Sequence, residues 1–191
     1  MDDVELPGFH ERALAHTRRY VEGIAEDQWG LDTPCDDWDV RELVNHVVAG
    51  NFWAGELGRG RTIEQVGDRL DGDVLGDDAL AAYDESARAA QGAFGAPGAM
   101  QAACAVSYGP VPGAVYSGHR LIDVFIHGWD VAVATGQDTT LDPELVDACW
   151  AVVKPQAELL AGSGGFATDV MADPNADLQT RLLALLGRSA T

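Results

Sequence analysis

The chain has 191 residues, of which 47% are hydrophobic, and its 31 acidic and 12 basic residues leave a formal net charge of −19. This length suits one domain with a sizeable core, and the hydrophobic content is too high for a disordered chain. A surface this negative repels phosphate backbones and anionic lipid headgroups, and no basic run interleaved with aromatic residues argues otherwise. We therefore expect a globular protein that binds neither nucleic acid nor a membrane surface.

Cysteine usage and the N-terminal residues indicate the compartment. Cys35, Cys104 and Cys149 are far apart and form no Cys-x-x-Cys pair, which favours reduced thiols over a disulfide framework. The start, MDDVELPGFH, is acidic and lacks the apolar region of a signal peptide. The sequence contains no run of about 18 apolar residues, so no transmembrane helix is predicted. We expect a cytoplasmic protein.

Helical periodicity and turn signals divide the N-terminal half of the chain. Apolar residues recur at helical spacing from about Phe9 to Gln28. Asp39 and Glu42 are then spaced as an N-cap and its capping-box partner, which predicts a second helix that runs to about Leu57. The stretch GRGRTIEQVGDRLDGDVLGDD is rich in Gly and Asp and predicts a loop with one turn of helix. A third helix, rich in Ala, is expected from about Asp78 to Phe94.

The pattern changes before the longest apolar segment. Met100–Ser107 is short, apolar and extended in character, and the glycines and prolines of 109–113 are expected to break the chain. A fourth helix is predicted from about Ala114 to Thr135, and Gly136 closes it as a C-cap.

The C-terminal part predicts two more helices. Pro143 opens a fifth helix at its first position, and Pro155 should kink or divide it. Gly162–Asp177 predicts a loop, and Leu178–Leu186 predicts a short closing helix. Long consecutive helices with little strand signal predict an all-α fold: an up-down four-helix bundle with a short additional C-terminal helix, in a single domain over residues 1–191.

The fourth helical segment, which contains HRLIDVFIHGWDVAVATG, is apolar almost all the way round yet carries two imidazoles and two carboxylates. A helix that is apolar except for one narrow stripe is normally buried, and buried ionisable groups are costly unless they are paired or bind a metal. Residues four apart project side by side, so Asp123 and His127 can bind one ion from a single helix. On a helical wheel at about 100° per residue, a stripe of roughly 80° contains Tyr116, His119, Asp123, His127 and Asp130.

A histidine in the second predicted helix completes a candidate metal site. His46 lies among apolar residues in RELVNHVVAGNFW, and Gly50, one turn later, leaves room beside it. If the second and fourth helices face each other, His46, Asp123 and His127 suit a divalent transition metal with an open position, which is the catalytic arrangement. The alternatives are a buried hydrogen-bonded pair of Asp123 and His127, and a satisfied core histidine at position 46.

Three stretches carry a resemblance to a known family: TPCDDWDVRELVNHVVAGN, HGWDVAVATG and DPNADLQTRLLALLGR. They resemble the DinB/YfiT-like metalloenzyme superfamily, and above all the N-terminal metal-binding domain of mycothiol-dependent maleylpyruvate isomerase. The resemblance covers nearly the whole chain and implies a four-helix bundle with a divalent metal at one end, bound by His46, Asp123 and His127. The isomerase has Glu where this chain has Asp123, and it has a second, C-terminal domain that contributes to its reaction.

Two further residues of the stripe are given roles. His119, one turn before Asp123, is expected to move protons or to point into the mouth of the pocket, and a fourth metal ligand is the alternative. Asp130 would either accept the second N–H of His127 or cap a neighbouring backbone. Zinc is the expected ion, with Ni²⁺ and Fe²⁺ as alternatives.

Two classes of function are compatible with these residues. In the first, the open metal position binds a low-molecular-weight thiol such as mycothiol as its thiolate, which attacks a small electrophilic molecule in a transferase or isomerase reaction. A variant uses metal-bound water for hydrolysis. In the second class, the bundle is a non-catalytic module that binds a metal or a small ligand, with a homodimer as one arrangement. A fourth protein ligand that closes the site would favour the second class, so whether the protein is an enzyme stays open.

Overall fold

The protein is described here by a computed structural model, in which most residues are helical and one two-stranded hairpin interrupts the helices. Contacts divide the chain into two compact units, residues 2–139 and residues 140–191. The expectation of one domain over the whole chain stays a prediction. The structure describes residues 5–156, 173 and 175–189.

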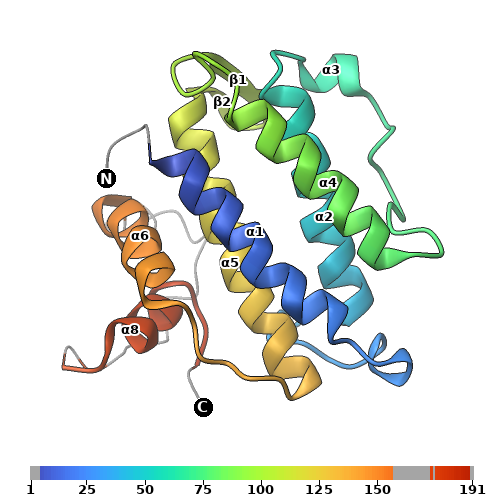
Figure 1. Cartoon of the computed structure of the whole chain (residues 1–191), viewed down its shortest axis with the longest axis vertical. Helices are drawn as coiled ribbons and strands as arrows, with labels where there is room; N and C mark the ends of the chain where they lie inside the picture. Colours follow the sequence, from blue (N-terminus) through green and yellow to red (C-terminus); the bar gives the residue numbers. More distant parts are fainter. Residues whose placement is uncertain (1–4, 157–172, 174, 190–191) are drawn as a thin grey trace. The chain divides into compact units, whose positions relative to one another are not determined.

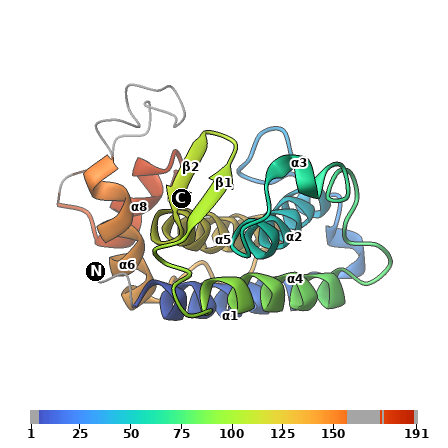
Figure 2. The ribbon, with the colours of Figure 1, turned by 90° about the horizontal axis from the view of Figure 1, so that it is seen from above.

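The first unit is built on the helices α1 (Leu6–Glu22), α2 (Val40–Leu57), α4 (Ala79–Phe94) and α5 (Gly113–Thr135). α1 packs against α4 and α5, and α2 also packs against α4 and α5, so each of these helices has two neighbours among the other three. Figure 2 shows α1 and α4 in one layer and α2 and α5 in a second. The candidate site residues of α2 and α5 therefore belong to the same layer.

The start of α2 follows from its capping residues. The Asp39 carboxylate accepts a hydrogen bond from the backbone N–H of Glu42, and the Glu42 carboxylate accepts one from the backbone N–H of Asp39. These two bonds satisfy N–H groups that have no partner inside the helix. The second helix that the sequence predicts, with its end near Leu57, is confirmed.

The first helix ends earlier than its periodicity predicts. α1 stops at Glu22, and Gly23 caps it with a backbone N–H that bonds the carbonyls of Arg19 and Tyr20. The expected continuation to Gln28 is wrong, because Glu26–Gln28 forms a separate 3-10 turn. A Cβ at residue 23 would meet the terminal amide of Gln137, so this side chain packs directly over Gly23.

A hairpin departs from the all-α expectation. Strand β1 (Ala103–Val106) pairs antiparallel with β2 (Gly109–Pro112), and Val106 lies opposite Gly109. The segment that the sequence assigned to a chain break is thus a strand. Its two prolines are compatible with this role because each strand of a two-stranded sheet is an edge, where half of the N–H groups bond nothing in the sheet. The short helix α3 (Ile63–Val66) is the single turn expected in the Gly- and Asp-rich stretch.

The second unit contains α6 (Pro143–Val153) and α8 (Leu178–Leu185), which pack against each other. Pro155 divides the chain as predicted: α6 ends at Val153 and a 3-10 turn follows at Lys154–Gln156. The Arg181 guanidinium lies over the Trp150 ring, 4.8 Å from its centroid, and ties the two helices together. Most of the loop predicted from 162 to 177 lies outside the described residues. Figure 1 colours α6 orange and α8 red.

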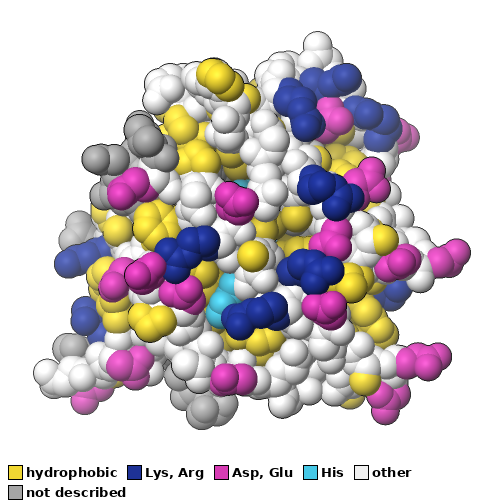
Figure 3. Space-filling model, viewed as in Figure 1, with side chains coloured by type: hydrophobic (Ala, Val, Ile, Leu, Met, Phe, Trp, Pro, Cys, Tyr) yellow, Lys and Arg dark blue, Asp and Glu magenta, His cyan; other side chains and the backbone are white. Residues whose placement is uncertain are grey.

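The surface over α1 and α4 mixes both signs of charge. Figure 3 shows Lys and Arg side chains alongside Asp and Glu on this face. One such pair joins the two helices, because Arg18 Nε lies 2.7 Å from Asp84 Oδ1. Among the described residues, no helix is long and apolar enough to cross a membrane.

Candidate functional site

Helices α2 and α5 run antiparallel and bring the predicted site residues together. His46 lies beside Asp123, whereas Asn51, further along α2, hydrogen-bonds to Arg120, which comes earlier in α5. The helices face each other, which was the condition that the sequence analysis placed on a shared site.

Three side chains converge at this contact. The Nε2 atom of His46 lies 3.3 Å from Oδ1 of Asp123, and the Nε2 atom of His127 lies 3.7 Å from the same oxygen. The two imidazole centroids are 5.0 Å apart, and one ligand atom from each of the three residues lies within 4.8 Å of the others. Two imidazole nitrogens and one carboxylate oxygen are donors that a divalent transition metal prefers, so the residues fit such an ion.

The second oxygen of Asp123 is held by a buried arginine that the sequence analysis did not assign to the site. Arg120 Nη1 donates to Asp123 Oδ2 at 2.8 Å, and Nη2 donates to Asn51 Oδ1 at 3.1 Å. A Cβ at Gly50 would collide with the Arg120 guanidinium. The guanidinium of Arg120 therefore fills the space beside Gly50, which the sequence analysis expected to be open next to His46. Because Arg120 binds Oδ2 of Asp123, the other oxygen, Oδ1, is the one that lies near the two imidazoles.

The charges of this cluster are strongly coupled. Burial raises the pKa of Asp123, but the positive charges of Arg120 and His127 and the contact with His46 outweigh it, so the pKa lies well below its usual value. Burial lowers the pKa of His127, but the charge of Asp123 and the hydrogen bonds to Asp130 and Cys35 raise it by more, to about 9. At neutral pH the cluster thus holds an anionic carboxylate beside a proton that a metal ion would have to displace.

The far side of the His127 ring contacts two more residues. Its Nδ1 atom lies 2.9 Å from Oδ2 of Asp130, whose side chain is fully buried. Cys35 Sγ lies 3.4 Å from the same carboxylate oxygen and 3.8 Å from Nδ1 of His127. Cys35, His127 and Asp130 form a second group of close ligand atoms, and it uses the opposite nitrogen of the shared histidine. The sequence predicted only a reduced thiol at Cys35, and the fold places this thiol beside Asp130 and His127.

His119 belongs to neither of these two ligand groups, which are the ones found among the described residues. Its Nδ1 atom lies 2.6 Å from the hydroxyl of Tyr108, in the turn of the hairpin. Tyr116 is buried and packs edge-on against Phe94. Sequence reasoning missed Tyr108 because it did not predict the hairpin that carries this residue to α5.

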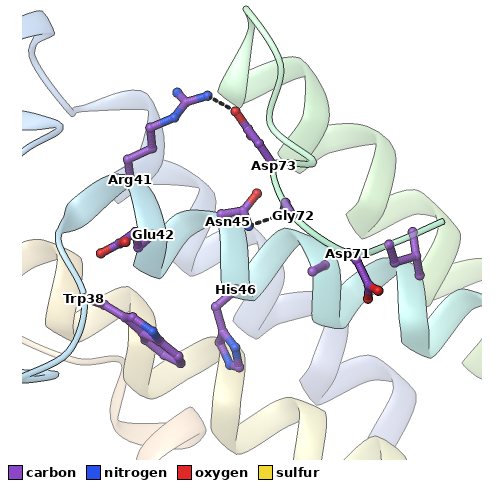
Figure 4. Close-up of a pocket in the computed structure, with 10 residues that line it drawn as sticks. Trp38, Arg41, Glu42, Asn45, His46, Asp71, Gly72 and Asp73 are labelled. Carbon is purple, nitrogen blue, oxygen red and sulfur yellow. Dashed lines mark hydrogen bonds and ion pairs between the residues drawn. The ribbon is translucent and has the colours of Figure 1, made fainter. Parts of the chain in front are cut away.

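A cavity of about 670 Å³ opens beside His46. The Trp38 ring stacks on the His46 ring with centroids 4.5 Å apart and an interplanar angle of 30°. Figure 4 shows these two rings on one side of α2, while Arg41 pairs with Asp73 on the other. Asn45 fixes the loop that forms the opposite wall, because its amide donates to the Gly72 carbonyl at 2.8 Å. A small molecule could reach His46 from this cavity.

The sequence of this chain matches a known protein family. The sequence model of the family described as the mycothiol maleylpyruvate isomerase N-terminal domain matches residues 10–132. The chain belongs to this family. The matched residues include His46, Asp123 and His127. The match confirms the resemblance that was inferred from the sequence.

Two curated relatives share almost the full length of this family member. Both are uncharacterised proteins of Mycobacterium tuberculosis, from two strains, and each is 36% identical, with 94% of this chain and 96% of the relative covered. Because the match spans nearly all of each protein, residues outside 10–132 are shared as well.

Solved structures extend the family likeness to three dimensions. The crystal structure of mycothiol-dependent maleylpyruvate isomerase matches with a TM-score of 0.66 and 17% identity, and covers 82% of this chain and 70% of that one. A mutant of that isomerase, with a histidine replaced by alanine, matches with a TM-score of 0.65 and 14% identity over the same shares. At these identities the matches show a common fold.

Proposed function

We propose that this protein is a divalent-metal-dependent enzyme that uses a low-molecular-weight thiol, mycothiol, in a transferase or isomerase reaction on a small electrophilic molecule. The observation that carries the proposal is the convergence of His46 Nε2, Asp123 Oδ1 and His127 Nε2. The structural neighbours are a mycothiol-dependent isomerase and its mutant, which supports the choice of thiol and reaction. We also propose that α1, α2, α4 and α5 are the up-down four-helix bundle expected from the sequence.

In this proposal His46, Asp123 and His127 hold the ion, with zinc first and nickel or ferrous iron as alternatives. The bound ion would supply a positive charge that lowers the pKa of a thiol and so provides a nucleophile at neutral pH. Asp130 orients the His127 ring through Nδ1, and Arg120 balances the charge of Asp123.

His119 contacts Tyr108 and is not among the clustered ligand atoms, which supports a metal ion with a position left open for a substrate. The hydroxyl of Tyr108 lies 2.6 Å from Nδ1 of His119, so this nitrogen already has a partner in the hairpin. We assign His119 to proton transfer with the substrate rather than to metal binding, and a thiol would take the fourth position.

Metal analysis tests the ligand assignment. Protein purified without chelator should contain about one divalent ion per chain, and His46→Ala and His127→Ala should each reduce the content below a tenth, since two remaining ligands hold such an ion poorly. Cys35→Ala is the matched control, because Cys35 belongs only to the second ligand group. Unchanged metal in both histidine variants, or loss of metal in Cys35→Ala alone, would contradict the assignment.

A thiol titration tests the reaction class. Calorimetric titration of the metal-loaded protein with mycothiol should show saturable binding that disappears in His127→Ala. Thiol-dependent loss of an electrophile should then follow in a panel of small unsaturated carbonyl compounds. Metal-loaded protein that binds no thiol would overturn the enzymatic proposal and favour a non-catalytic metal-binding module.

A further inference from the structure

A second cavity, of about 320 Å³, opens at the other end of the contact between α2 and α5. Residues of α2, α3, α5 and the hairpin contribute to it, and no charged side chain is among the described residues that line it. It is thus unlike the cavity beside His46, whose walls include Arg41, Glu42 and Asp73. The side chains that form it include Trp53, Leu57, Ile63, Val106, Tyr108 and Tyr116.

Helix geometry places this cavity at a defined distance from the candidate metal ligands. Trp53 follows His46 by seven residues on α2, and Tyr116 precedes Asp123 by seven residues on α5. Seven residues are nearly two helical turns, so each pair shares a helix face and is separated by about 10 Å along the axis. Because the two helices are antiparallel, both steps lead from the metal cluster toward the same end of their contact.

His119 lies between the two places. It is one turn from Tyr116 and one turn from Asp123 on α5, and its Nδ1 atom contacts the hydroxyl of Tyr108, which lines the cavity. A molecule with one end in the cavity and its reactive atom near the cluster would pass the imidazole assigned to proton transfer.

We propose that this apolar cavity binds the hydrocarbon end of the electrophilic substrate, and that the substrate is an uncharged molecule carrying one or two aromatic rings. This inference rests on the proposed function and adds the substrate class. A cavity of roughly 150 Å³ accommodates benzene, so the observed volume suits a ring system of one to two rings. Exposed hydrophobic side chains also gather here, since Ile63 and Tyr108 are 39% and 62% exposed.

Charge explains the preference for an uncharged ligand. A carboxylate that enters this cavity would lose water and find no cationic side chain among the lining residues, which is costly. The formal net charge of −19 also repels anions at longer range. A substrate with carboxylates, such as maleylpyruvate, is therefore disfavoured at this cavity.

Two matched probes test the inference without metal or thiol. Naphthol and naphthoate share a ring system and differ in charge at pH 7, and their binding to chelator-treated full-length protein can be measured by calorimetry. We expect naphthol to bind at least tenfold more tightly. Ile63→Lys places a cation at the cavity and should remove this preference, whereas Leu31→Lys, at a residue that is also 39% exposed but does not line the cavity, should preserve it.

The outcomes separate this inference from the metal proposal. Naphthol binding should persist in His127→Ala, so a failure of metal binding leaves the cavity result readable. Equal affinity for the two probes, no saturable binding of naphthol, or the same change in Leu31→Lys as in Ile63→Lys would overturn the inference. A Ser107→Trp variant, at an exposed turn residue that lines the cavity, should block naphthol and provides a second check that does not alter a helix.

Discussion

Helix α5 makes two buried contacts of opposite character. Toward α1 it is uncharged and close: a Cβ at Gly128 would collide with the Thr17 side chain, whose hydroxyl donates to the Val124 carbonyl at 2.8 Å. Toward α2 it is charged, with Arg120 and Asp123 paired at 2.8 Å. Both contacts are buried, but the second contains charges that need partners. The candidate site therefore lies on the face of α5 toward α2, which carries paired ionisable groups, and not on the face toward α1.

The largest effect is expected from Arg120→Met, which breaks the charged contact while it keeps a long apolar side chain. Asp123 would lose its cation and Asn51 its donor, and we expect a loss of about 3 kcal/mol of unfolding free energy in metal-free protein, at the lower end for a broken buried pair because the Asp123 side chain is 27% exposed. Urea unfolding measures it. The control is Arg18→Met, in the more exposed pair with Asp84, where a much smaller loss is expected. Equal losses would show that the charged contact has no special energetic role.

A second prediction concerns His10, a fully buried residue of α1 whose ring packs edge-on against Phe94 and has no hydrogen-bond partner among the described residues. Burial, and to a smaller extent the charge of Arg120, lower its pKa to about 3, against an opposing effect of Asp123. Between pH 6.5 and about 3 the unfolded chain therefore binds a proton that the folded chain does not, so the unfolding free energy decreases as the pH is lowered through this window.

Replacement of His10 should remove that dependence. In His10→Leu, the decrease in unfolding free energy from pH 7 to pH 5 should be smaller than in the wild type by about 2 kcal/mol. Urea unfolding at both pH values measures the difference. An identical decrease in the two proteins would mean that His10 accepts a proton in the folded state.

The third prediction compares two glycines: Gly50 of α2, which faces α5, and Gly128 of α5, which faces α1. In Gly50→Ala the new Cβ meets the Arg120 guanidinium, and in Gly128→Ala it meets Thr17. Each should cost about 1 kcal/mol, since crowding outweighs the gain in helix propensity. Only Gly50→Ala should weaken zinc binding, by several-fold, because it displaces Arg120 from Asp123. If Gly128→Ala weakened zinc binding equally, the contacts would not be separable.

The smallest effect is expected for Asp123→Glu. The carboxylate remains, so zinc affinity should fall by less than about tenfold. Competition with a chromogenic chelator measures the affinity. Asp123→Asn is the comparison, and its loss of negative charge should cost more. A glutamate variant as weak as the asparagine variant would mean that side-chain length matters as much as charge.

Much of the local structure could be predicted. The capping box of Asp39 and Glu42 marks the start of α2, Pro155 follows the end of α6, and Gly136 closes α5 in the left-handed conformation at φ 69°. These signals act over a few residues, so they can be read from neighbouring letters. The errors lie where distant segments decide: α1 is cut short at Gly23, beside Gln137.

The candidate site also combines residues that the sequence could predict with residues that only distant contacts bring together. The spacing of Asp123 and His127 and the apolar setting of His46 suggested a shared ion before any coordinates. The contact of Tyr108 with His119 could not be predicted, because it depends on a hairpin, and neither could the position of Cys35 beside Asp130, because the two are 95 residues apart. Arg120 was visible in the sequence, but nothing local indicated that Gly50 of another helix would make room for it.

The sequence by itself determined the family, the long helices and the polar stripe of α5, because periodicity, caps and spacing are properties of short stretches. Only the tertiary structure decided which partners that stripe meets: an imidazole from α2, a guanidinium in the space of a missing side chain, and an apolar cavity about two helical turns away. The physical reason is that a buried charge is tolerated only where neighbours from elsewhere in the chain compensate it, and those neighbours are set by packing.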